Sequence, residues 1–228
     1  MTIDNYFDKI YIINLTRSPE RRKNMILQME KYKIKNFIFP PTIDGKYLDK
    51  NKLKENNEWA YPGNKLCNNI CSCGGKGHRL SPTQISLHLN NYHIWQDMVK
   101  NNYKKCLILE DDCVFTEYFE NLANDIKFIP KNWELLYLGH SQKINSSNTE
   151  EKNSKFKKLI RGVNETHIYG VSLEGARILI EHTYPIRAAI DGYLAHFMIN
   201  NRVLQNNYIS KTSYATNGSI NKIYKSTI

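Results

Sequence analysis

Three consecutive carboxylates, Glu110, Asp111 and Asp112, are the strongest chemical signal in the sequence. They directly follow the apolar residues 107–109, a run typical of a buried β-strand. Three acids at the end of a core strand repel one another unless a positive charge lies among them. Hard oxygen ligands suit Mg²⁺ or Mn²⁺. The sequence therefore indicates a divalent-cation site here, with a solvated acidic turn as the alternative.

The spacing of these acids predicts which of them share the ion. Alternate residues of a strand point to one face, so Glu110 and Asp112 are expected to be the metal ligands. In an open α/β sheet, ligands bind beyond the carboxyl ends of the strands. His140 and His167 stand near the ends of other predicted strands and are further candidate ligands, although a lone histidine is more often structural.

An anion site is predicted at the first loop of the chain. Residues 10–13 are apolar and β-branched, as in a strand. Ser18 and Pro19 then have the form of a helix start, and the helix is expected to run to about residue 33. A strand followed by a loop and a helix N-terminus places backbone N–H groups beside an anion. Arg17 and Arg21 could add charge-assisted bonds to a diphosphate, with plain solvation of the helix as the alternative.

Strands and helices are expected to alternate along the rest of the chain. This order predicts an α/β fold of Rossmann type, with a mostly parallel sheet flanked by helices. Further strands are expected at 37–39, 133–138, 167–171 and 202–205, and helices at 81–99, 117–127, 172–181 and up to about 198.

The length of 228 residues is that of one domain. We expect a single domain over 1–228, with a long polar insertion at 46–80 and a loosely held C-terminal tail at 208–228. Residues 141–161 are polar and rich in lysine, which predicts a surface excursion.

A cysteine cluster lies in the insertion, at Cys67, Cys71 and Cys73, with His78 close behind. The four side chains could form a small Zn²⁺ site, although their spacing is not that of a common zinc motif. A local disulfide and reduced thiols are the alternatives. The chain has five cysteines, an odd number, which favours free thiols.

The net charge of +10 favours polyanionic partners without choosing among them. No basic stripe interleaved with aromatic residues is present, so nucleic acid is not an expected partner. No apolar run reaches the roughly 20 residues of a membrane span, and no signal peptide is evident. These features lead us to expect a cytoplasmic protein.

Several motifs in the same order resemble glycosyltransferase family 25, the family of lipooligosaccharide galactosyltransferases and collagen galactosyltransferase domains. The opening Ile-Tyr-Ile-Ile-Asn-Leu-Thr-Arg-Ser-Pro-Glu-Arg-Arg at 10–22 and Leu-Glu-Asp-Asp at 109–112 are fairly specific together. The other matching segments are Ile-Asp-Gly at 43–45, the helix ending near Trp95, Tyr-Leu-Gly at 137–139, His-Ile-Tyr-Gly-Val-Ser-Leu-Glu-Gly-Ala-Arg at 167–177 and Ile-Asp at 190–191.

The resemblance implies a GT-A-like fold, a UDP-sugar donor and Mn²⁺, or Mg²⁺, held by the acidic motif. It implies an inverting transfer of a hexose, galactose or glucose, to a hydroxyl of a glycan or glycoprotein. Asp191 is the candidate general base, with a helix N-cap as its alternative role. Carried over by position, Asn14, Leu15 and Arg17 would lie near the nucleotide, Asp44 would reach the uridine, and Glu110, Asp111 and Asp112 would reach the ribose and metal.

Two positions depart from the family pattern. Asn90 and Asn91 stand where a Ser-His pair is usual, and Gly192 follows Asp191 where a second acid is common. Both lie near the expected acceptor side. A catalytically degenerate protein that binds a sugar or a partner is therefore the alternative function.

Overall fold

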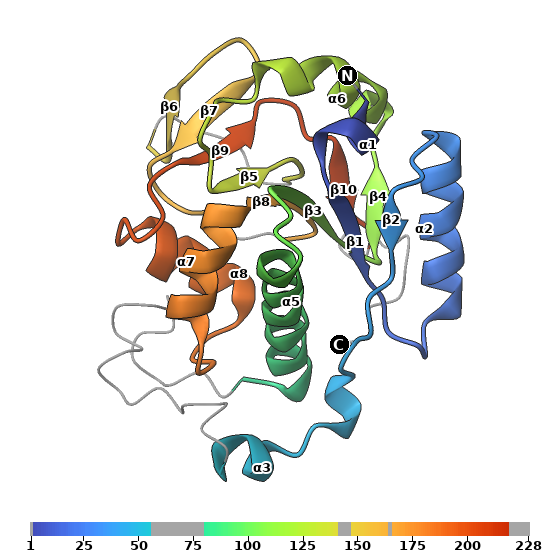
Figure 1. Cartoon of the computed structure of the whole chain (residues 1–228), viewed down its shortest axis with the longest axis vertical. Helices are drawn as coiled ribbons and strands as arrows, with labels where there is room; N and C mark the ends of the chain where they lie inside the picture. Colours follow the sequence, from blue (N-terminus) through green and yellow to red (C-terminus); the bar gives the residue numbers. More distant parts are fainter. Residues whose placement is uncertain (1, 56–79, 141–146, 164–165, 219–228) are drawn as a thin grey trace.

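A mixed eight-stranded sheet forms the centre of the protein, in the order β2-β1-β3-β8-β5-β9-β7-β6 (Figure 1). The computed structural model describes residues 2–55, 80–140, 147–163 and 166–218. The strands of this sheet are β1 (Lys9–Ile13), β2 (Phe37–Ile38), β3 (Lys105–Glu110), β5 (Leu135–Tyr137), β6 (Thr149–Glu151), β7 (Phe156–Leu159), β8 (Ile168–Ser172) and β9 (Asn207–Ser210). A second, two-stranded antiparallel sheet joins β4 (Cys113–Phe115) to β10 (Ala215–Asn217).

The predicted α/β fold is confirmed, and its sheet combines both strand directions. β2, β1 and β3 are parallel neighbours, as are β5 and β9. β8 lies between β3 and β5 and runs antiparallel to both, and β7 runs antiparallel to β9 and β6. All the strands of this sheet except β8 and β7 thus run in one direction, so the mostly parallel sheet expected from the sequence is confirmed, with these two strands reversed within it.

Helices cover both faces of the sheet. α2 (Pro19–Lys31) packs on one face, and α5 (Pro82–Lys100), α7 (Leu173–Thr183) and α8 (Ile190–Gly192) lie on the other (Figure 1). The smaller helical elements are α1 (Ile3–Tyr6), η1 (Gly45–Tyr47), α3 (Lys50–Glu55), η2 (Glu117–Asn121), α6 (Leu122–Asp125), η3 (Ile126–Phe128) and the π-helix η4 (Tyr193–Ile199).

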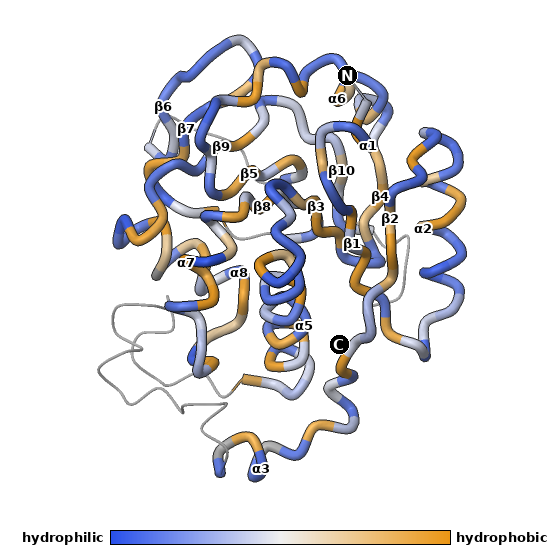
Figure 2. The backbone as a smooth tube through the Cα atoms, viewed as in Figure 1, coloured by the Kyte–Doolittle hydropathy of each residue, from blue (hydrophilic) through white to orange (hydrophobic). Residues whose placement is uncertain are grey.

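Side-chain alternation along β3 divides the core into two layers. Leu109 belongs to the layer that contains Met25 of α2, whereas Ile108 belongs to the layer that contains Trp95 of α5. Hydrophobic residues are concentrated on β1 and β3, between the helices (Figure 2). Because side chains repeat with a period of two, Glu110 points to the same face as Ile108. The last residue of β3 is thus directed towards α5 and α8.

The start of α5 agrees with its prediction. The Ser81 hydroxyl accepts a hydrogen bond from the Gln84 N–H, and the Gln84 side chain accepts one from the Ser81 N–H. Pro82 stands in the first turn, where its missing N–H costs nothing. This reciprocal capping box fixes where α5 begins, at the edge of the sheet that carries the acids.

The expectation of a loose tail from residue 208 is wrong for residues 208–218. β9 (Asn207–Ser210) is buried between β5 and β7, and β10 pairs with β4. Nor is 202–205 a strand, because the chain turns there before entering β9. β9 escaped prediction because it buries polar residues: Asn207, for example, donates its side-chain N–H to the Leu204 carbonyl at 2.9 Å.

The polar segment 141–161 also contributes to the sheet, because its described part contains the hairpin β6–β7. Of the predicted insertion at 46–80, the structure describes 46–55 and residue 80. Among the described residues, no helix combines the length and the apolar character that crossing a bilayer requires.

Candidate active site

The turn after β3 separates the three acids. β3 ends at Glu110, and Asp111 and Asp112 form a turn that leads into β4. The prediction that Glu110 and Asp112 share a strand face is therefore wrong in its geometry, because Asp112 is no longer in a strand. The three side chains face different surroundings, and each is buried or nearly so.

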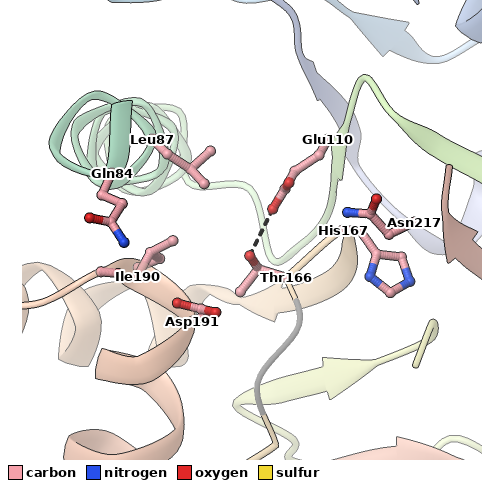
Figure 3. Close-up of a pocket in the computed structure, with 9 residues that line it drawn as sticks. Gln84, Leu87, Glu110, Thr166, His167, Ile190, Asp191 and Asn217 are labelled. Carbon is pink, nitrogen blue, oxygen red and sulfur yellow. Dashed lines mark hydrogen bonds between the residues drawn. The ribbon is translucent and has the colours of Figure 1, made fainter. Parts of the chain in front are cut away.

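A cavity of about 240 Å³ opens beside Glu110 (Figure 3). Its lining combines polar side chains from five separate segments, Asn217 of β10 and His167 among them, with apolar groups of α5 and α8. They include Gln84, Leu87, Glu110, Thr166, Ile190 and Asp191. The cavity thus lies at the carboxyl end of β3, where the sequence placed a binding site.

Glu110 is the buried acid of this cavity. Its Oε1 accepts a hydrogen bond from the Thr166 hydroxyl at 2.7 Å (Figure 3). Burial raises the pKa of Glu110 well above its ordinary value, and the Asp112 charge raises it further. The charges of Asp191 and Asp111 act in the same direction, while the Thr166 bond opposes them. An added cation would relieve this crowding.

Asp191 reaches the same cavity from α8. Ala189 occupies the N-cap position, so Asp191 is not the helix cap that was its alternative role. Its Oδ1 accepts a hydrogen bond from the Gly192 N–H at 2.7 Å. The departure at Gly192 leaves open space, because a Cβ there would meet no heavy atom within 4 Å. Asp191 thus keeps a carboxylate in the cavity on which a substrate hydroxyl could be deprotonated.

Asp111 turns the other way, towards β1 and α2. Its carboxylate accepts hydrogen bonds from the Asn14 amide at 2.7 Å and from the Arg21 guanidinium at 3.0 Å. Burial raises the pKa of Asp111, and these two donors partly offset that effect. Asn14 also donates to the Ser18 carbonyl at 3.1 Å. Asp111 therefore fixes the first loop to the end of β3.

The remaining residues predicted to lie near the nucleotide stand in a second group beside this loop. Arg17 donates to the Asp44 carboxylate at 2.7 Å. Burial alone would raise the pKa of Asp44, but the Lys46 N–H and Arg17 outweigh it and lower that pKa. Leu15 is half-buried in the turn, where its carbonyl accepts from the Ser18 N–H at 2.8 Å.

Asn90 holds the Asp44 segment on α5. Its side chain accepts from the Ile43 N–H at 2.7 Å and donates to the Ile43 carbonyl at 3.0 Å. Asn91 accepts from the Tyr169 hydroxyl and donates to the Leu87 carbonyl at 2.8 Å. Both asparagines that depart from the family pattern are thus buried and make structural bonds.

The described residues contain no preformed group of three potential metal ligands. Glu110 and Asp112 remain the best pair, because the Asp112 charge acts directly on Glu110. An Mg²⁺-like ion needs only one or two protein carboxylates when substrate phosphates complete its shell. The donor set therefore fits such an ion in the presence of a diphosphate.

The two candidate histidines bond to backbone carbonyls. His140 Nε2 lies 3.0 Å from the Ser210 carbonyl oxygen, and His167 Nε2 lies 3.1 Å from that of Ala215. Both bonds reach the C-terminal strands β9 and β10, so these histidines help to hold those strands in place. The proposed zinc ligands Cys67, Cys71, Cys73 and His78 lie outside the described residues.

Sequence reasoning missed three residues of this region. Thr166 precedes the segment 167–171, which was assigned as a strand, and no motif marks it. Gln84 was read only as part of a helix start, although the capping position also directs its side chain. His88 is buried behind α8, where its ring Nδ1 lies 3.1 Å from the Ala188 carbonyl oxygen. Its burial, which lowers its pKa to about 4, could not be foreseen.

A sequence profile of glycosyltransferase family 25, described as LPS biosynthesis protein, matches residues 7–194. The chain belongs to glycosyltransferase family 25. The match spans all the segments that carried the resemblance, from the first strand to Asp191. The GT-A-like α/β fold expected for this family is confirmed.

Curated relatives include proteins named as galactosyltransferases and proteins named as inactive family members. A glycosyltransferase 25 family member of Aedes aegypti is 29% identical over 201 residues, covering 84% of this chain and 31% of the relative. Procollagen galactosyltransferase 2 of Mus musculus is 28% identical over 183 residues, covering 76% and 27%. The inactive glycosyltransferase 25 family member 3 of Mus musculus is 27% identical over 179 residues, covering 76% and 29%. The chain thus spans about a third or less of the length of these relatives.

Among solved structures, a glycosyltransferase involved in glycosylation of the major capsid of PBCV-1 is similar, with a TM-score of 0.44 and 11% identity. The alignment covers 88% of this chain and 80% of that one.

Proposed function

We propose that the protein transfers a hexose, galactose or glucose, from a UDP-sugar to a hydroxyl acceptor on a glycan or glycoprotein, in a metal-dependent, inverting reaction. The observation that carries this proposal is the cavity in which Glu110 and Asp191 both take part. One acid lies at the end of the central strand and the other on a separate helix. Two carboxylates from separate elements in one cavity suit a site with distinct metal and base positions.

The donor is assigned to the side of β1 and β3. Asn14, Leu15, Arg17 and Asp44 lie on the loops that follow β1 and β2, and Asn14 contacts Asp111 of the acidic turn. Two cationic side chains stand there, each already paired with an acid. The Arg17 guanidinium could turn from Asp44 to the diphosphate of UDP, while Arg21 keeps its ion pair with the buried Asp111.

The chemistry then divides between the two acids. The Asp191 carboxylate accepts the proton of the acceptor hydroxyl, and the oxygen of that hydroxyl forms the new bond to the anomeric carbon of the hexose. The bond from that carbon to the diphosphate oxygen breaks, and UDP leaves. A divalent cation held by Glu110 and Asp112 would supply positive charge for the departing diphosphate. Attack from the face opposite the leaving group inverts the anomeric configuration.

A catalytically degenerate binding protein is the second candidate function. It is favoured by relatives that are named inactive. Against it stand the retained acids Glu110, Asp112 and Asp191. The departure at Asn90 and Asn91 gains hydrogen bonds to Ile43, Leu87 and Tyr169, and it removes none of the three acids.

Release of UDP tests the proposal. The protein is incubated with UDP-galactose or UDP-glucose and MnCl₂, with EDTA as the matched control, and UDP is quantified. We expect release that depends on the metal, and metal-dependent UDP binding that Asp112→Ala abolishes while the fold survives. Normal binding of UDP and Mn²⁺ by Asp112→Ala would show that the metal assignment is wrong. Absence of both donor binding and UDP release in the unchanged protein would favour the binding protein.

A further inference from the structure

Gln84 is a polar side chain of the cavity that the proposed reaction does not use. It stands in the first turn of α5 and lines the same cavity as Glu110 and Asp191. The residue is exposed, so a ligand in the cavity can reach its amide group. Its apolar neighbours in the lining are Leu87 of α5 and Ile190 of α8.

The capping box fixes how this amide is oriented. The Ser81 N–H donates to Gln84 Oε1 at 2.9 Å, so the amide oxygen is committed to the start of the helix. Only an oxygen can accept this bond, which decides which end of the amide is the oxygen. Figure 3 shows the amide nitrogen on the side of Asp191 and Ile190, with the oxygen on the far side. In the described part of the chain, no hydrogen bond occupies this NH₂ group.

We propose that the Gln84 amide donates a hydrogen bond to a ring hydroxyl of the hexose of the nucleotide sugar, which makes Gln84 a residue that binds the transferred hexose. This inference rests on the proposed function. The transferred hexose has its anomeric carbon between the departing diphosphate and the general base. It therefore occupies the cavity lined by Glu110 on one element and Asp191 on another.

The size and lining of the cavity fit one sugar ring. Its volume of about 240 Å³ lies below the roughly 300–1,000 Å³ of pockets for drug-sized ligands. Leu87 and Ile190 offer apolar contact to the C–H groups of a ring, and Gln84 offers a donor for its hydroxyls, while Asp191 stays available to the acceptor hydroxyl. The Gln84 amide is already held in place by Ser81, so its ordering costs little when the sugar binds.

Gln84→Glu is the sharpest test, because it changes the donor and keeps the cap. A glutamate at this position still accepts from the Ser81 N–H, as in the common capping box, but presents an oxygen where the NH₂ group was. Binding of UDP-galactose, UDP-glucose and UDP is measured by calorimetry with MnCl₂. We expect the affinity for a UDP-hexose to fall about tenfold, with UDP affinity and Tm unchanged.

Two further variants distinguish the loss of the hydrogen-bond donor from the effect of an added charge and from the effect of a weakened helix start. Gln84→Met removes the donor without adding charge, and we expect the same selective loss for UDP-hexose. Ser81→Ala removes the hydroxyl of the cap but keeps the backbone N–H that orients the amide. It should lower Tm and leave UDP-hexose affinity unchanged.

Three results would overturn the inference while the proposed function stands. Gln84→Glu could weaken UDP and UDP-hexose equally, which would be a charge effect on the nucleotide. Gln84→Met could bind UDP-galactose and UDP-glucose as the unchanged protein does. Ser81→Ala could reproduce the loss, which would assign it to the helix start. By contrast, failure of the unchanged protein to bind UDP at all would overturn the proposed function and this inference together.

Discussion

Asp111 and Glu110 are neighbours in the chain, but their carboxylates lie in different surroundings. Asp111 has a guanidinium and an amide as partners, from Arg21 and Asn14. Among the described residues, the Glu110 carboxylate accepts a hydrogen bond from the uncharged Thr166 hydroxyl alone, and burial together with the charges of Asp112 and Asp191 raises its pKa. One acid is neutralised within the chain, whereas the other lies among like charges. Asp111 therefore stabilises the fold, whereas the surroundings of Glu110 favour the binding of a cation.

The largest expected effect is a loss of transfer activity when Asp191 is changed. Asp191→Asn removes the proposed base but keeps the shape of the side chain, so transfer should fall about 10²–10⁴-fold. UDP binding with Mn²⁺ should remain, because Asp191 lies on α8, away from the loops assigned to the nucleotide. Steady-state release of UDP measures the rate of transfer, and calorimetry measures UDP binding. Glu174→Gln, an exposed acid on α7, is the control. Equal loss in both variants would remove Asp191 from the chemistry.

Isosteric changes at the two neighbours should alter stability in opposite directions. Asp111→Asn removes the charge from a nearly buried ion pair with Arg21, which should lower the free energy of unfolding by about 3 kcal/mol. Glu110→Gln removes a charge that burial disfavours and keeps an acceptor for Thr166, so it should raise Tm in EDTA. Thermal unfolding measures both. If both variants lost stability equally, the contrast between the two acids would not hold.

The gain from Glu110→Gln should depend on pH. The folded-state pKa of Glu110 lies above its unfolded value, so the native state holds the extra proton. Stability from this group is therefore present at low pH and lost as the pH rises through and beyond the ordinary glutamate value. Tm differences between Glu110→Gln and the unchanged protein should be small at pH 4 and larger at pH 8. A difference that shrinks with rising pH would contradict the burial of a charged Glu110.

His88 supports the segment that carries Asp191, and it should set an acid limit on stability. Burial lowers its pKa to about 4, so the unfolded chain takes up a proton below about pH 6.5 before the native protein does. Stability from neutral His88 is thus present above pH 6.5 and lost as the pH falls towards 4, by up to about 3 kcal/mol. His88→Gln should flatten this decline in urea unfolding. His93→Gln, at an exposed position of the same helix, should leave it unchanged.

The smallest expected effect comes from Asn90, which holds the segment before Asp44 on α5. Asn90→Ala removes both bonds to Ile43, which should cost about 1–3 kcal/mol in stability. Because Asp44 follows Ile43, UDP affinity should fall severalfold while the rate at saturating donor changes little. Donor titrations of UDP release separate these two parameters. A change in the saturated rate alone would place Asn90 in the chemical step, contrary to its position behind the loop.

The sequence predicted the elements whose local chemistry and tertiary surroundings agree. Ser81 and Gln84 correctly predicted the start of α5, and the apolar residues 107–109 correctly predicted the central strand. It could not reveal that β3 stops at Glu110, because strand ends depend on neighbouring strands. Because β3 ends there, the Asp111 side chain turns to Arg21 and the Glu110 side chain lines the cavity. Asn90 likewise looked like a departure from a motif, since its bonds to Ile43 join residues 47 positions apart.

The central sheet cannot be completed during synthesis until β9, one of the last strands in the sequence, has been made. Tyr208 pairs with Leu136 in the register of β9 and β5, and β7 attaches to the sheet through β9. At about 5–20 residues per second, a ribosome needs several seconds to reach β9 after it has made β5. During that interval, the edges of β5 and of the β6–β7 hairpin stay open to other chains. Yield of folded protein in cells should therefore respond to chaperone supply and to temperature more than the purified protein's own stability would indicate.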